Sequence, residues 1–520
     1  MKKLNYFLFL AFVMTAIFFT LGSSQAAAEK VLTIAVDEEI EGTDTHQIYW
    51  YSPAHEMISE PLIRLDLETK NIVPALASRF ETSNNGKNLI FTIPEGLTFT
   101  NGDPLTIQDV KASIERYKEV SPYASDYAAI EDVVIRDGNK LVLEASQPPA
   151  YIWPALCSVA SGVMNPKVIK SMDKAAFNRK AISYGPAAVE KWVQGSHIML
   201  VKNPNYKTYA TYFDNKGPIY FDKIKVRFIA DAFTRVSEFL AGNIDIIWSI
   251  PKENVDEIMG NDKFGVFEGL SDGVNWIMVN HRNAPLDDFN VRRAIALAVD
   301  REQLRIVLAD RVMVTYGMLS PSQICYDAAG NAAFKKENAM NIEKAKSLLA
   351  EAGWSDKNGD GILEKGGKDL EITMAVPLDR APLKRSAPVI QAQLKKVGIK
   401  LNLREYETSY VKQAVRDHKC DLALRAYSWL DPSDLSYKFH TESGIYSDPV
   451  LDKLLDEGLY IMDNEKRAQK YTEAQKQIFA KAVAIPLFVE KNYHGWQKNI
   501  KGLKFETTGG NMYINDAFRE

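Results

Sequence analysis

The sequence predicts a mixed α/β fold, and three observations lead to this prediction. Short apolar or alternating runs typical of strands recur along the chain, and apolar residues at helical spacing lie between them. Turn residues separate these segments at short intervals. With 46% hydrophobic and 25% charged residues, the 520-residue chain has an ordinary globular composition. Its length suits about three domain-sized units.

Two strands and one helix are predicted in the first quarter of the chain. Residues 31–36 (VLTIAV) form an apolar run, and residues 88–93 (NLIFTI) form another. Thr106 is expected to cap a helix over residues 107–117, because its hydroxyl can accept the free amide hydrogens of the first turn.

The second half of the chain has the clearest helical periodicity. A helix is predicted to open at Asn290, and two more are predicted over residues 342–352 and 387–397. Gly353 and Gly398 are expected to end the latter two.

A strand, a helix and a second strand are predicted in the region that follows. Residues 399–404 alternate between apolar and polar, residues 409–418 are helical in pattern, and residues 421–426 (DLALRA) read as a strand. This order implies a parallel pair. Because ligands of open α/β sheets bind beyond the carboxyl ends of parallel strands, the loop 427–434 is the predicted binding site.

The loop and the strand before it supply the main candidate ligand-binding residues. Tyr427 and Trp429 can stack against a ligand, and Asp431 can pair with a donor or a cation. Arg425 ends a buried strand, where an unpaired charge is costly. We therefore expect Arg425 to have a partner, which is either a protein carboxylate or an acidic group of the ligand.

The first 28 residues are predicted to be an export signal. Lys2 and Lys3 precede an apolar run over residues 6–21 that is shorter than the roughly 20 residues of a membrane-spanning helix. Three alanines follow, so cleavage is expected before Glu29. No cysteine lies near this point to carry a lipid anchor, so a soluble periplasmic protein is expected.

The charge balance argues against two classes of partner. The formal net charge of the chain is −4 at pH 7. It gives no electrostatic reason to bind nucleic acid or an anionic membrane surface, and direct membrane insertion is not expected.

Redox and zinc motifs are not predicted. Cys157, Cys325 and Cys420 lie far apart and form no CxxC pair, and the seven histidines form no close metal pair. One disulfide and three small buried side chains both stay open as interpretations. No cofactor is expected.

A weak calcium candidate lies at residues 356–361 (DKNGDG). Asp356, Asn358 and Asp360 offer oxygen ligands at alternating positions, as in the first half of a calcium loop. The twelfth position is Gly367 where a bidentate glutamate is needed. A plain turn is therefore favoured, and a structural calcium ion is the alternative.

A serine-hydrolase motif is present without its required context. Residues 269–273 (GLSDG) match G-x-S-x-G, in which Ser271 would be the nucleophile. The motif requires a strand before the serine and a helix after it, but residues 274–280 (VNWIMVN) look like a strand. A secreted hydrolase is therefore the less favoured alternative to a binding protein.

Several segments in fixed order resemble the family 5 bacterial extracellular solute-binding proteins, the group that binds dipeptides, oligopeptides and nickel. The likeness covers nearly the whole chain after residue 28. The segments are residues 73–110, 290–304 (NVRRAIALAVDREQL), 341–354 (NIEKAKSLLAEAGW), 389–403 (VIQAQLKKVGIKLNL), 482–488 (AVAIPLF) and 499–503 (NIKGL).

The resemblance implies a large, hinge-bending, two-lobed periplasmic-binding-protein fold with an extra subdomain in the first lobe. The first lobe would comprise residues 29–70, the extra subdomain 71–190, a second segment 191–283 and a return segment 486–520, with the second lobe at 284–485.

The function implied by the resemblance is that of the capturing component of an ABC importer. Such a protein closes around a small organic solute, for example a peptide, an opine or an oligosaccharide, and delivers it to permease subunits in the inner membrane. It would be a monomer and not an enzyme. A nickel chelate or another metal complex is the alternative cargo.

Departures from the family pattern leave the cargo open. Peptide binders hold the ligand ammonium with an aspartate shortly before an acidic-Pro or Asp-Pro pair. Aligned on Asp431-Pro432, that place is taken by Ser428, whereas aligned from Arg425 it is taken by Asp431. Nickel binders carry a histidine in this loop, and here the nearest is His440.

Candidate residues from other parts of the chain complete the predicted site. His46, Trp50 and Tyr51 follow the first strand, where the resemblance places pocket residues of the first lobe, and Trp276 is a further candidate. Core packing is the alternative role for each.

Overall fold

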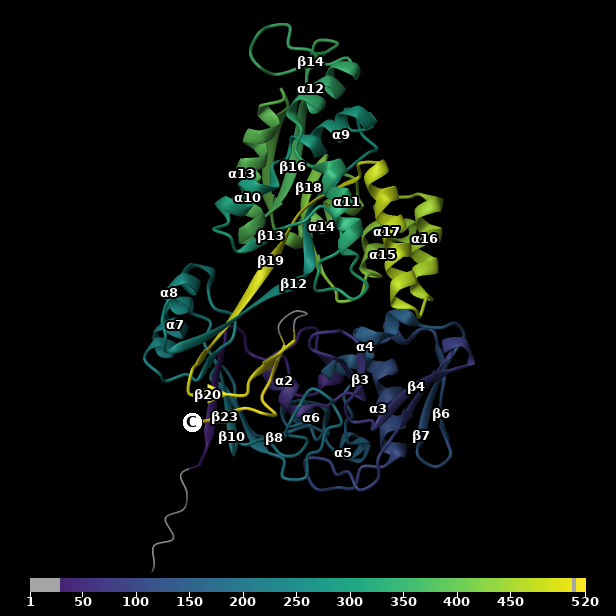
Figure 1. The fold of residues 1–520 in the computed structure, drawn as a ribbon, viewed down its shortest axis with the longest axis vertical. Coiled ribbons are helices and arrows are strands. Elements are labelled where there is room, and N and C mark those ends of the chain that lie inside the picture. The colour runs from purple at the N-terminus through teal and green to yellow at the C-terminus, as the bar shows by residue number, and fades with distance from the viewer. Residues whose placement is uncertain (1–28, 507–510) are drawn as a thin grey trace, which may run out of the picture.

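Two long strands, β12 (Phe264–Val279) and β19 (Ala484–Gln497), pair antiparallel and join two lobes of the molecule (Figure 1). The structure is a computed structural model that describes residues 29–506 and 511–520. The predicted export signal lies outside the described residues. The two lobes and the strands that join them confirm the predicted α/β, two-lobed architecture.

The largest sheet of the described residues runs through both lobes in the order β17-β16-β18-β12-β19-β11-β1-β10-β9-β8, and β13 also pairs with β19. The upper part of the sheet in Figure 1 belongs to the second lobe and the lower part to the first. Its remaining strands are β1 (Val31–Val36), β8 (Ala187–Val193), β9 (His197–Lys202), β10 (Lys223–Phe228), β11 (Ile246–Ile247), β13 (Val312–Val314), β16 (Glu371–Pro377), β17 (Lys400–Tyr406) and β18 (Leu422–Ser428).

The first lobe adds a separate antiparallel sheet with the order β4-β5-β7-β6. Its core contains Leu89, Phe91 and Leu143 from the sheet and Val110 and Tyr117 from helix α3. The other first-lobe elements are α2 (Pro53–Ile58), β2 (Ile63–Leu65), β3 (Ile72–Pro74), β4 (Arg79–Ser83), β5 (Asn88–Thr92), α3 (Ile107–Val120), η3 (Ala124–Tyr127), β6 (Ile130–Arg136), β7 (Lys140–Ala145), η4 (Ala150–Ile152), α4 (Trp153–Cys157), α5 (Pro166–Ser171), α6 (Lys174–Arg179), α7 (Ala232–Leu240) and α8 (Val255–Met259). The C-terminal segment returns to this lobe with β20 (Ile500–Lys501), β21 (Lys504–Phe505), β22 (Met512–Tyr513) and β23 (Phe518–Arg519).

In the second lobe, helices cover both faces of the sheet, and the strand residues alternate between two cores. Met374 packs into one core and its neighbour Ala375 into the other, and Leu422 and Ala423 divide in the same way. This is the period of two along a strand. The elements that complete this lobe are α9 (Phe289–Ala298), α10 (Arg301–Val307), α11 (Ala328–Asn338), α12 (Ile342–Glu351), β14 (Glu364–Lys365), β15 (Lys368–Asp369), α13 (Ala381–Lys395), α14 (Thr408–Arg416), α15 (Asp434–Phe439), α16 (Pro449–Leu459) and α17 (Asn464–Ala480).

Several predicted elements are confirmed closely. Strand β1 has the predicted bounds, β5 ends one residue before the predicted end, and α12 begins where predicted. Thr106 caps α3 as expected, since its Oγ1 accepts a hydrogen bond from the Asp109 amide at 3.3 Å. The left-handed φ of +85° at Gly353 accounts for the end of α12.

Two expectations about the second lobe were wrong. Helix α13 begins at Ala381, well before the predicted residue 387, and it carries Pro388 in its interior. Strands β17 and β18 are parallel, but they are not neighbours, because β16 lies between them and pairs with both. Strand β16 had not been recognised in the sequence.

Candidate functional site

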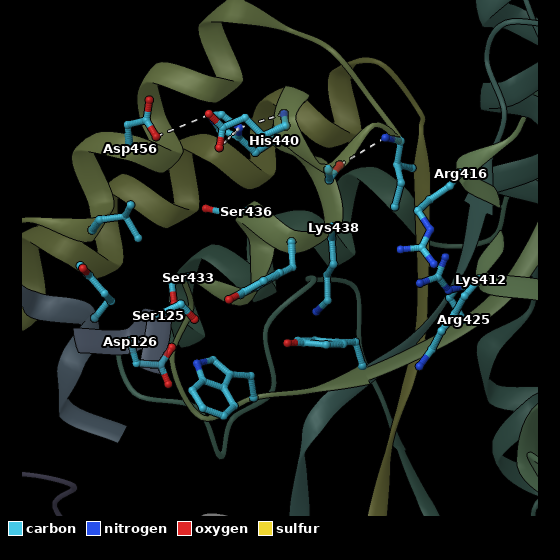
Figure 2. Close-up of a pocket in the computed structure, with 18 of the residues that line it drawn as sticks. Ser125, Asp126, Lys412, Arg416, Arg425, Ser433, Ser436, Lys438, His440 and Asp456 are labelled. Atoms are coloured by element: carbon cyan, nitrogen blue, oxygen red, sulfur yellow. Dashed lines mark hydrogen bonds and ion pairs between the residues drawn. The ribbon is translucent and has the colours of Figure 1, made fainter. Parts of the chain in front are cut away.

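A cleft of about 710 Å³ lies between the lobes, at the carboxyl end of strand β18. Most of its wall comes from the second lobe, and the first lobe contributes Ser125, Asp126 and Tyr151 from η3 and η4. Figure 2 shows many of these side chains around the cavity. The second-lobe residues are Trp276, Lys412, Arg416, Arg425, Tyr427, Trp429, Ser433, Ser436, Tyr437, Lys438, His440, Glu442, Ser443, Ile445, Asp456 and Leu459.

Ring contacts bring the two lobes together at one end of the cleft. The Tyr123 ring of the first lobe stacks on the Trp429 indole with a centroid separation of 5.9 Å. Tyr151 meets Tyr460 edge to face at 6.3 Å. Met462 of the second lobe packs against the core of the first. The lobes are therefore in contact beside the cleft.

Lys70 forms a second link between the lobes, beside the hinge strands. Its Nζ donates hydrogen bonds to the carbonyl oxygens of Pro321 and Gln323, at 2.5 and 3.4 Å. Asp272, on β12, has a buried Oδ1 with no hydrogen-bond partner among the described residues. Burial raises the pKa of Asp272 to about 7, although the charge of Lys70 acts in the opposite direction.

Three cations, Lys412, Arg416 and Arg425, gather on one side of the cleft (Figure 2); we call them the basic group. Lys412 and Arg416 are four residues apart on α14 and so share a face of that helix. Within the described part of the chain, no hydrogen bond or ion pair of these three side chains is found. Arg425 is half-buried, and burial lowers its pKa.

An aromatic wall lies next to the basic group. Trp276 is only 2% exposed, and its Nε1 has no hydrogen-bond acceptor among the described residues. The Arg425 guanidinium lies 5.8 Å from the Trp276 ring centroid, and the Lys438 ammonium lies 5.0 Å from it. Lys438 also lies 5.7 Å from the Tyr427 ring. Arg425 and Lys438 therefore lie within cation–π distance of the rings of this wall.

Lys438 is neutralised within the protein, unlike the basic group. Its Nζ donates to Oδ2 of Asp434 at 2.6 Å, and both side chains are buried. Burial raises the pKa of Asp434 to about 6, while the Lys438 charge acts to lower it. Lys438 thus lines the cleft, but its positive charge is balanced by Asp434 and is not available to a ligand.

Asp431 does not line the cleft, which corrects the expectation that it pairs with a ligand. Its two carboxylate oxygens accept hydrogen bonds from the Arg467 guanidinium, both at 2.7 Å, and neither side chain is exposed to solvent. Its Oδ1 also accepts from the Ser433 amide at 2.9 Å. The physical reason is an internal bidentate ion pair, which the sequence distance of 36 residues had concealed.

Other predicted residues also lie outside the cleft lining. His46 is fully buried in the first lobe, where its Nε2 lies 2.9 Å from the Gly162 carbonyl oxygen, and burial lowers its pKa to about 4. The Tyr51 hydroxyl bonds to Ser158, and Trp50 and Ser428 are likewise absent from the lining. For His46, core packing is the better interpretation. Trp276, Arg425, Tyr427 and Trp429 are the predicted residues that the fold brings together.

Several residues that line the cleft were not predicted from the sequence. Lys412 and Arg416 carried a signal, a pair of cations at i and i+4 on the helix before the binding loop. His440 was noted only as the nearest histidine. Asp126 carried no signal, because its place in the cleft depends on the contact between the lobes.

The remaining sequence features are the G-x-S-x-G match, the candidate calcium loop and the three cysteines. Ser271 is inside strand β12, whereas a nucleophile elbow requires a turn into a helix. Residues 356–361 form an exposed turn, in which Asp356 accepts hydrogen bonds from the amides of Gly359 and Gly361 at 2.7 and 3.0 Å. The calcium ion stays a prediction. All three cysteines are free thiols, so no disulfide forms in this structure.

Two lobes joined by a pair of long strands, with a cleft between them, are the architecture of a two-lobed binding protein. The model of the bacterial extracellular solute-binding proteins, family 5, matches residues 71–447, which is more than half of the chain. The chain belongs to this family. Among the described residues, no helix has the length and apolar character needed to cross a bilayer.

Relatives within the family include binding proteins for different cargoes. The chain is 26% identical to the oligopeptide-binding protein AppA of Bacillus subtilis, with 84% of this chain and 82% of that protein covered. It is also 26% identical to the nickel-binding periplasmic protein of Escherichia coli, with 89% of each covered. The crystal structure of NikA from Brucella suis in complex with Fe(III)-EDTA matches with a TM-score of 0.81 at 20% identity, covering 95% of this chain and all of that one.

Proposed function

We propose that this protein is the periplasmic capturing component of an ABC importer and that its cargo is a small organic solute with an acidic group. The protein is exported, acts as a monomer, encloses the solute between its lobes and delivers it to permease subunits in the inner membrane. Peptides and opines belong to this class, and so do oligosaccharides that carry an acid. The protein catalyses no reaction on its cargo.

The observation that carries the proposal is the unpaired Arg425. A half-buried guanidinium without a carboxylate partner is costly, and the positive charge of the neighbouring Arg416 adds repulsion. A carboxylate or phosphate of a ligand would remove this cost, because it can bind a guanidinium in bidentate geometry. Of the two partners that the sequence left open for Arg425, the ligand is therefore the one that this geometry supports.

The aromatic wall suits the rest of such a solute. The Trp276 Nε1 is a buried donor that a ligand oxygen can satisfy, and Tyr427 and Trp429 line the cleft with apolar ring surface that their contacts with Lys438 and Tyr123 leave over. A few placed polar groups among rings are typical of small-molecule sites.

Native mass spectrometry of the freshly purified protein tests this proposal. We expect a bound small molecule with an acidic group, and we expect Arg425→Ala to lose it. Glu343→Gln, an exposed change far from the cleft, serves as the matched control. A bound solute without an acidic group, or one that Arg425→Ala retains fully, would contradict the proposed role of the basic group.

A nickel chelate or similar metal complex is the second candidate cargo, and one observation favours it. His440 lines the cleft, and its Nε2 lies 3.5 Å from an Asp456 carboxylate oxygen. Calorimetry with nickel and histidine together separates the candidates. Tight binding that His440→Ala abolishes supports the metal complex, and heats equal to buffer dilution exclude that cargo.

A further inference from the structure

A carboxylate of the first lobe lies in the cleft away from the basic group. Asp126 is on η3 of the first lobe, and Figure 2 shows its side chain beside Ser125 and Ser433, across the cavity from Arg425. Its Oδ2 is enclosed by protein atoms and has no hydrogen-bond partner among the described residues. The basic group of the second lobe and the Asp126 carboxylate of the first lobe therefore both line the cleft, while Glu442 and Asp456 of the second lobe lie next to His440.

The surroundings of Asp126 favour the binding of a cationic group next to its carboxylate. Burial raises the pKa of Asp126 to about 7, and the negative charge of Asp431 raises it further, with no cationic side chain of the described residues acting against them. The Arg467 guanidinium is held by Asp431 in a bidentate pair, so it is not free to serve Asp126. An ionised Asp126 thus lacks the partner that a buried carboxylate normally has.

We propose that Asp126 selects a cationic group on the solute, so that the cargo is a zwitterion held with its anion at Arg425 and its cation at Asp126. This inference rests on the proposed function of the cleft. The carboxylate that takes this role comes from the first lobe, since Asp431 of the second lobe is already paired inside the protein and Glu442 and Asp456 lie next to His440.

Placing the two charged partners on different lobes has a mechanical consequence. A zwitterion spanning Asp126 and Arg425 bridges the lobes, so its binding free energy depends on both lobes being together. A solute that lacks the cation contacts only the second lobe through its charge. It should bind more weakly and also favour the closed arrangement less.

The test is a competition for the purified protein after its native ligand has been removed by unfolding and refolding. The probe is a defined mixture of amino acids, di- and tripeptides, opines, sugar acids and neutral sugars. N-acetylated and methyl-esterified forms of the zwitterions are included, because they lack the cation and the anion respectively. Native mass spectrometry identifies what is retained, and calorimetry measures the affinity of the retained solute and its two derivatives.

Asp126→Asn is compared with wild type and with Asp132→Asn, which changes an exposed acid of the same lobe that does not line the cleft. We expect wild type and Asp132→Asn to retain a zwitterion and to bind its N-acetylated form at least about tenfold more weakly, the effect of one charge-assisted hydrogen bond. We expect Asp126→Asn to bind the zwitterion about tenfold more weakly and to distinguish it little from the N-acetylated form.

The outcomes separate this inference from the proposed function. If Asp126→Asn keeps the wild-type preference, or the retained solute has no cationic group, the assignment of Asp126 is overturned while solute capture stands. If the basic group is not needed, because methyl esters bind as well as free acids, the proposed function fails first. Retention of no solute at all contradicts both.

Discussion

Replacing Asp431 by asparagine should destabilise the protein strongly and act on solute binding only indirectly. The Asp431 and Arg467 side chains are both fully buried and joined by two hydrogen bonds of 2.7 Å. Removing one charge leaves the other buried without a partner, which costs about 3–5 kcal/mol. That is a large part of the roughly 5–15 kcal/mol that separates native from unfolded proteins.

The assay is urea-induced unfolding followed by circular dichroism. Glu343→Gln is the matched surface control and should change the free energy of unfolding by less than about 0.5 kcal/mol. A double variant, Asp431→Leu with Arg467→Met, should be less destabilised than Asp431→Asn, because no charge is left unpaired. If the free energy of unfolding of Asp431→Asn lies within about 1 kcal/mol of the wild-type value, Asp431 and Arg467 do not form the buried ion pair described here.

Three further predictions concern the cleft and the hinge. Trp429→Ala should weaken solute binding about tenfold, because it removes a wall of the cleft. It should change the urea midpoint little, because the lost ring contact with Tyr123 is worth only about 0.5–1.5 kcal/mol. Unchanged affinity in calorimetry would show that this ring is not part of the site. Lys70→Met should increase the radius of gyration of the ligand-free protein in small-angle scattering, because two hydrogen bonds between the lobes are lost; an unchanged profile would argue against this link. Asp272 should contribute a loss of stability as the pH rises from about 4 to about 7, because between these values its carboxyl is protonated in the folded protein and ionised in the unfolded chain. Asp272→Asn should flatten that loss in thermal unfolding, and identical slopes would refute the assignment; the charged groups that face it are Lys70 and Asp434.

Local patterns were enough to predict elements whose stabilising contacts lie close in sequence. The Thr106 cap and the Gly353 stop act through backbone groups a few residues away, so the sequence alone identifies them. Strand β16 was missed because it is a central strand, buried on both faces, and lacks the alternation that marked β17. Pro388 inside α13 likewise hid the first turns of that helix.

The candidate site could be predicted only where one segment supplies it. Arg425, Tyr427 and Trp429 follow one another on a strand and its loop, and the rule for parallel sheets places them at a crevice. The role of Asp431 depends on Arg467, and that of Asp126 depends on the opposite lobe. Such partnerships arise from tertiary contacts, which a single sequence does not reveal.

The central claim is that the two lobes close around a solute held at Arg425. Small-angle X-ray scattering of the ligand-stripped protein, before and after addition of the solute recovered from native protein, tests it most directly. We expect the radius of gyration to fall on addition in wild type and to stay constant in Arg425→Ala. Equal profiles with and without solute in wild type, at concentrations where calorimetry shows saturation, would contradict the account.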